Sequence, residues 1–100
     1  RKNYLINLYE ITSGIATSSL IHPREIFRAA IRMGCTAIIV VHNHATGDPS
    51  PSKADISVAR NLLESSEIIS IDLLDFMIIG KASIDPMQNG YYSFRKNKLL

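Results

Sequence analysis

The chain has 100 residues, enough for one domain with a useful but not large hydrophobic core. Hydrophobic residues make up 46% and charged residues 20%, which indicates a folded globular protein and excludes a disordered chain. The net charge of +2 comes partly from the two chain ends, so it is weak support for nucleic acid binding, and the apolar runs are far shorter than the roughly 20 residues of a membrane span.

The first half of the chain predicts a strand followed by a helix. Residues 4–12 carry tyrosine, isoleucine and leucine in mixed alternation and predict a strand, with Gly14 marking its end. A second extended piece over residues 19–21 is only weakly indicated. Pro23 suits a first helical position and apolar residues recur on one face after it, so a helix is predicted up to Gly34.

The second half predicts two more strands around a second helix, and then a short strand. Residues 35–41, "CTAIIVV", are apolar at nearly every position, as expected of the middle strand of a sheet. A loop over residues 47–51 leads to a helix that begins at Ser52 and ends near Ile68. Residues 71–79 and the "YYSF" segment predict the last strands. Helices that alternate with strands favour the α/β class, a mixed β-sheet flanked by helices.

The stretch "VVHNHATGDPSPSKAD" contains the residues with the clearest chemistry. His42 and His44, two residues apart at the end of a strand, can point the same way and share one ion. Asp55 lies in the first turn of the next helix, which a loop can return to the carboxyl end of that strand, the usual place for sites in α/β sheets. Two imidazoles and a carboxylate suit Zn²⁺ and leave a fourth position for water, which is typical of a hydrolytic site.

Each of these residues also has a structural interpretation. Ser52 and Asp55 stand at the spacing of a helix capping box, and the cap and the ligand roles can both hold. His22 before the first helix and Cys35 before the apolar strand are expected to be a helix-flanking residue and a small buried thiol rather than ligands. Asp48 is expected to form a turn.

The segment "HPREIFRAAIRMGCTAIIVVHNHATGDPSPSKADISVARNL" resembles the RadC family of JAMM (MPN-like) metalloproteases, and the likeness continues through "LLDFMIIG" and "YYSF". The JAMM signature is a distant Glu, then His-x-His, ten residues and Asp. The resemblance implies that His42, His44 and Asp55 bind Zn²⁺ and that Ser52 stabilises an oxyanion during catalysis. It also implies the JAMM/MPN architecture, which is similar to that of cytidine deaminases, and hydrolysis of a peptide or isopeptide bond.

The same resemblance calls for a general-base Glu upstream of the histidines. We expect that residue to precede Arg1, because the chain starts with Arg rather than Met and is interpreted as a C-terminal part, residues 1–100, of a longer protein. Glu10 and Glu25 are the substitutes within the chain. An exposed strand position explains Glu10, and complementarity to the helix dipole explains Glu25.

Two other functions stay open beside the metallopeptidase. One is a catalytically inactive metal-binding or interaction domain of a DNA-repair-associated protein, an alternative favoured by Ala45 and Thr46, which stand where RadC proteins typically have Pro-Ser. The other, a zinc deaminase, needs cysteine ligands and is disfavoured by the single Cys35. The expected partner is a protein or peptide substrate. DNA is a further partner, for which the charge gives weak support, and the edge of the strand over residues 4–12 could pair with a second copy in a homodimer. No membrane contact is expected, and the single cysteine favours the cytoplasm.

Overall fold

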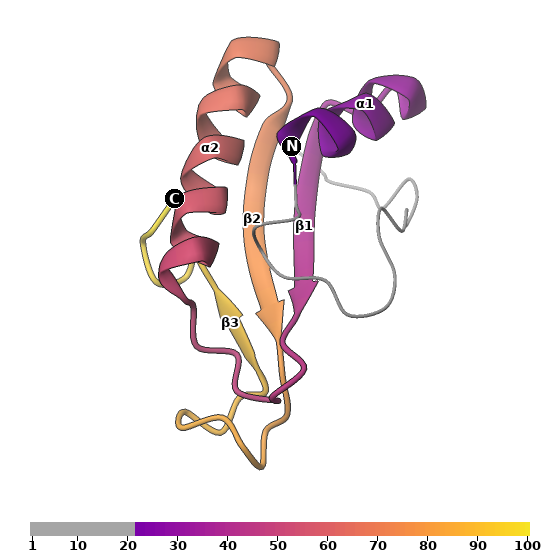
Figure 1. Cartoon of the computed structure of the whole chain (residues 1–100). Coiled ribbons are helices and arrows are strands. Elements are labelled where there is room, and N and C mark those ends of the chain that lie inside the picture. Colours follow the sequence, from indigo (N-terminus) through magenta and orange to yellow (C-terminus); the bar gives the residue numbers. More distant parts are fainter. Residues whose placement is uncertain (1–21) are drawn as a thin grey trace.

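The structure, a computed structural model, describes residues 22–100 and contains two helices and three strands in the order α1, β1, α2, β2, β3 (Figure 1). The predicted strands over residues 4–12 and 19–21 lie outside the described residues. The α1 helix spans Pro23–Met33 and ends at Gly34, whose positive φ of 68° gives a left-handed C-cap. These bounds confirm the helix predicted between Pro23 and Gly34.

The sheet is mixed, as predicted, because β1 (Ala37–Asn43) runs parallel to β2 (Asp72–Ile79), and β2 runs antiparallel to β3 (Tyr91–Ser93). The α2 helix (Lys53–Ile69) connects β1 to β2 and packs against β2, while α1 contacts α2 at the end of the sheet where β1 begins (Figure 1). This arrangement confirms the predicted α/β class, a mixed β-sheet flanked by helices.

The apolar segment over residues 35–41 forms β1, as predicted, but among residues 22–100 the strand with a neighbour on each side is β2, because the order is β1-β2-β3. The predicted strand over residues 4–12 lies outside the described residues, so the expectation that β1 is the middle strand stays a prediction. Ile39 and Val41, on one face of β1, are each 54% exposed, whereas Ile78 on β2 is fully buried.

A bulge in β2 sets which side chains face the helices. Ile38 pairs with Leu73, but the next residue, Ile39, pairs with Asp75, so Leu74 is an additional residue in β2. The extra residue shifts the alternation by one, and Phe76 then faces the core on the same side as Leu73.

The core lies between α1, α2 and the sheet. Its buried apolar residues come from all three: Ile26, Phe27, Ala30, Val58, Ala59, Leu62, Ile71, Leu73, Phe76, Ile78 and Phe94. Phe94, just after β3, packs edge-to-face on Phe76 with ring centroids 5.0 Å apart, which ties the end of the chain to β2. Among residues 22–100, no helix is long and apolar enough to cross a membrane.

Leu62 offers a direct test of this core, because its side chain on α2 has no exposed surface. Leu62→Ala should lower the free energy of unfolding by about 2–5 kcal/mol through lost burial and the cavity left behind. Ile68→Ala, on the same helix but at a residue 85% exposed, should change it by less than about 0.5 kcal/mol. Urea unfolding followed by circular dichroism measures both, and equal losses would contradict the assignment of the core.

Candidate metal centre

The two histidines of the His-x-His motif lie at the carboxyl end of β1. Alternation along the strand places His42 on the same side as Val40, and its side chain is only 9% exposed. His44 lies one residue beyond the strand, but its backbone N–H still donates to the carbonyl of Ile79 at 3.0 Å. The two imidazole rings therefore lie on one side, with centroids 5.2 Å apart.

The carboxylate comes from the first turn of α2. Ser52 is the N-cap of this helix, its Oγ accepts from the N–H of Asp55 at 3.1 Å, and Asp55 Oδ2 accepts from the N–H of Ser52 at 2.8 Å. This reciprocal pair confirms the predicted capping box. It also turns the Asp55 side chain back toward the end of β1, where it has no exposed surface.

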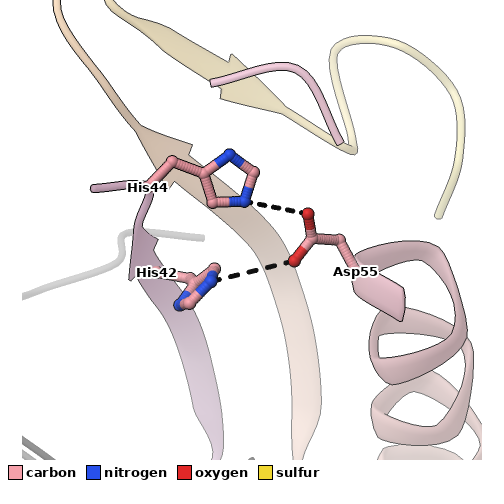
Figure 2. A group of neighbouring side chains, drawn as sticks. All are labelled: His42, His44 and Asp55. Atoms are coloured by element: carbon pink, nitrogen blue, oxygen red, sulfur yellow. Dashed lines mark hydrogen bonds and ion pairs between the residues drawn. The ribbon is translucent and has the colours of Figure 1, made fainter. Parts of the chain in front are cut away.

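The three side chains converge, as Figure 2 shows. The distance from His44 Nε2 to Asp55 Oδ2 is 2.9 Å, and from His42 Nε2 to Asp55 Oδ1 it is 3.8 Å. One ligand atom from each residue lies within 4.8 Å of the other two. The capping box and the strand thus bring together the nitrogen and oxygen atoms that the sequence motif singled out.

The hydrogen bond between His44 and the backbone of Asp48 indicates which ring nitrogen of His44 carries a proton. Its Nδ1 lies 2.9 Å from the carbonyl oxygen of Asp48, and since a carbonyl can only accept, Nδ1 carries a proton in this bond. In a neutral ring, Nε2 then presents a lone pair to a carboxylate oxygen 2.9 Å away. Two lone pairs at this distance are stable only with a positive charge between them, either a proton or a metal ion.

His42 is biased toward the neutral form. Burial lowers its pKa below the usual value of 6.5, the nearby Asp55 carboxylate raises it in part, and His44 adds a further lowering. The net lowering keeps the imidazole uncharged at neutral pH. A neutral ring is the form that binds a metal.

The donor set fits Zn²⁺. Two imidazole nitrogens and one carboxylate oxygen are one of the ligand sets of catalytic zinc sites with three protein ligands, and the Asp48 carbonyl behind His44 is the kind of partner that orients such a ligand. The sequence marked Asp48 as a turn former, which its carboxylate confirms by accepting from Ser50 N–H at 3.0 Å. The contact between the Asp48 carbonyl and His44 could not be predicted from the sequence, because every residue has a backbone carbonyl.

The remaining sequence candidates lie elsewhere or outside the described residues. Glu25 is exposed on the first turn of α1, 4.0 Å from the Arg24 guanidinium, and α1 lies at the opposite end of β1 from the histidines (Figure 1). His22 is the exposed N-cap of α1, which confirms its structural interpretation. Glu10 falls outside the described residues.

Two further polar residues have structural partners. The thiol of Cys35 is partly buried and donates to the carbonyl of Ala30. Asp75 on β2 accepts from the hydroxyl of Ser93 and from the backbone N–H of Arg95, so it joins β2 to the chain after β3. Neither belongs to the metal-ligand group found among the described residues.

Comparison with known proteins places these residues in a family context. The family model of RadC-like JAB domains matches residues 1–99. A UPF0758 protein of Chlorobium phaeovibrioides is 50% identical over 99 residues, and others from Chlorobium luteolum and Symbiobacterium thermophilum are 48% and 41% identical over the same length. Each match covers 99% of this chain but only 39–41% of the relative, so the chain spans about two fifths of their length.

The lowered pKa of His42 predicts a pH dependence of the metal-free protein. Below about pH 6.5 the unfolded chain binds a proton at this residue that the folded protein resists, so stability should fall as the pH drops from 7 toward the folded pKa. His42→Gln should make this part of the profile flatter. Urea unfolding at a series of pH values measures the slope, and identical slopes for the two proteins would show that His42 titrates as in the unfolded chain.

Proposed function

Because the chain belongs to the family of RadC-like JAB domains, we propose that it is a zinc-dependent metallopeptidase domain that hydrolyses an amide bond. The observation that carries the proposal is the convergence of His42, His44 and Asp55 with their ligand atoms within 4.8 Å. The substrate class is a protein or peptide, with the scissile bond a peptide or an isopeptide. JAB domains are often metalloproteases, which supports this activity for the present chain.

Each of the three side chains has a defined part in the proposed site. His42 and His44 would bind the ion through Nε2, and the carbonyl of Asp48 holds the His44 ring in the tautomer that leaves Nε2 unprotonated. Asp55 would bind through its carboxylate, which the capping box keeps in place. When bound, Zn²⁺ acts as a Lewis acid that polarises the carbonyl and activates water near neutral pH.

Ser52 is suited to stabilise negative charge on the substrate. In its bond with the Asp55 N–H the Ser52 Oγ is the acceptor, so its own O–H proton is not used there. Ser52 is exposed and lies at the start of α2, where the helix dipole also favours negative charge. Its hydroxyl can therefore donate to an oxyanion that develops as the amide carbonyl is attacked.

The proposed reaction also needs a carboxylate that accepts a proton from water and returns it to the leaving amine. Glu25, the candidate for this role within residues 22–100, lies on α1 at the opposite end of β1 from the histidines (Figure 1). The second candidate function is a domain that binds zinc and serves in protein or DNA transactions without hydrolysis. The single cysteine cannot form an internal disulfide, so it does not call for an oxidising compartment, and either candidate is proposed to act in the cytoplasm.

Zinc binding tests the site independently of catalysis. We expect the wild-type chain to bind about one zinc ion, and His44→Ala to weaken binding by more than about 100-fold, since even a partner behind a ligand typically contributes 10–100-fold. Competition with a chromophoric chelator measures the affinity. The control is His22→Ala, which removes an exposed histidine at the N-cap of α1 and should bind as the wild type does. Equal affinities in all three proteins would contradict the ligand assignment.

Hydrolysis tests the activity and separates the two candidates. In the full-length protein that carries this domain, loaded with zinc and given a fluorogenic protein substrate such as labelled casein, Ser52→Ala should lower kcat by about 100-fold or more with zinc content unchanged. Lys53→Ala, at the next and equally exposed position, should retain activity. Zinc binding without hydrolysis in the wild type would favour the inactive metal-binding domain.

A further inference from the structure

The loop over residues 80–90, between β2 and β3, contributes no ligand but lies against the turn that follows His44. The backbone N–H of Lys81 donates to the carbonyl of Gly47 at 2.6 Å. At the base of the loop, the N–H of Gly80 donates to the carbonyl of Gly90 at 2.8 Å, so the loop starts and ends at one point. Two segments far apart in the sequence thus meet beside the histidines.

The contact between Gly47 and Gly80 is too close for any side chain. A Cβ on Gly80 would overlap the carbonyl oxygen of Gly47 and would lie 2.8 Å from its carbonyl carbon and 2.9 Å from Cδ of the buried Pro49. A Cβ on Gly47, whose φ is 89°, would lie 2.7 Å from Cδ1 of Ile84 within the loop. The backbone of the loop therefore packs directly against the turn at Gly47, with no room for a side chain between them.

The loop owes its shape to a buried carboxylate that the proposed chemistry does not use. Asp85 is 5% exposed, and its two oxygens accept three backbone N–H groups of its own loop: Met87 at 2.9 Å, Asn89 at 3.0 Å and Gly90 at 2.9 Å. Its own N–H donates to the carbonyl of Lys81 at 2.9 Å. This one side chain thus satisfies three backbone N–H groups in the second half of the loop, which would otherwise need other partners.

The turn that the loop contacts is the one that orients His44. In this turn the backbone N–H of Gly47 donates to the carbonyl of His44. The carbonyl of the next residue, Asp48, accepts from Nδ1 of the His44 ring. A displaced Gly47 would carry the Asp48 carbonyl with it. The ring would then lose the partner that fixes both its rotation and its tautomer.

We propose that the loop over residues 80–90, folded around Asp85 and pressed on Gly47 through Gly80, positions the imidazole of His44. Asp85 and Gly80 are positioning residues that act through Gly47 and Asp48. The inference rests on the proposed zinc site for its effect on affinity. Its effect on the His44 ring does not depend on metal, so the two can fail separately.

The test compares two carboxylates of the 100-residue chain, Asp85 and Asp75, which both accept hydrogen bonds from backbone N–H groups. Asp85→Asn keeps the size of the side chain but turns one N–H acceptor into a donor that faces another donor. Asp75→Asn is the matched control, because Asp75 also accepts backbone and hydroxyl donors, but it joins β2 to the chain after β3 and does not contact the turn after His44. Urea unfolding measures the stability that each variant loses.

Two readouts separate positioning from a general loss of stability. Zinc affinity, from chelator competition, should fall about tenfold or more in Asp85→Asn and stay within twofold of the wild type in Asp75→Asn. In the metal-free proteins, two-bond ¹H–¹⁵N correlation spectra should show a proton on Nδ1 of His44 in the wild type and in Asp75→Asn. In Asp85→Asn this nitrogen should carry a proton in only part of the molecules.

The outcomes are distinct. Wild-type affinity and an unchanged proton on His44 Nδ1 in Asp85→Asn would overturn the inference, and so would equal loss of affinity in both variants. A wild-type chain that binds no zinc would overturn the proposed function, while the metal-free spectra would still decide the role of the loop. If Asp85→Asn does not fold, Gly80→Ala takes its place. Its control is Gly34→Ala at the C-cap of α1, where the added Cβ meets nothing within 4 Å but the φ of 68° is strained, so this variant loses stability without a clash at the turn after His44.

Discussion

The structure depends on a buried carboxylate. Asp55 has no exposed surface, and a charge removed from water is stable only where hydrogen bonds and opposite charge replace the solvent. The Ser52 N–H supplies one such bond, and the imidazoles of His42 and His44 lie within 3.8 Å and 2.9 Å. Because these partners come from the helix cap and from the end of β1, the chain can bury Asp55 only when the start of α2 meets the end of that strand. The proposed zinc site is therefore also a condition of the fold.

The same constraint explains the surroundings of the site. The turn after His44 must return the chain to α2 and also present the Asp48 carbonyl to the His44 ring. On its other side, this turn contacts the backbone of Gly80 and Lys81. Asp85 holds the loop to which these two residues belong. A ligand geometry that needs accuracy within fractions of an ångström is thus supported by a loop that holds no ligand.

Agreement between the predicted and observed elements was good wherever local chemistry decides. The first helix, the capping box at Ser52 and the strand over residues 71–79 are confirmed within one residue or so, because proline, glycine, capping side chains and apolar periodicity act locally. The bulge at Leu74 was not foreseen, and the place of β1 in the middle of the sheet stays a prediction. Strand order and register depend on the partner strand, and the residues of one strand carry little information about its partner.

For the site, the sequence by itself singled out His42, His44 and Asp55 as candidate ligands, because a strand end and the following helix start can bring residues at this spacing together, and in the structure these three side chains meet. Only the tertiary structure decided which nitrogen of His44 faces the carboxylate, because the carbonyl that fixes the tautomer belongs to a backbone that any residue type provides. The structure also shows that Asp85, thirty residues after Asp55, holds the loop that contacts the turn after His44. Sequence patterns record chemistry carried by side chains, whereas a contact between two backbones becomes visible only when the chain is folded.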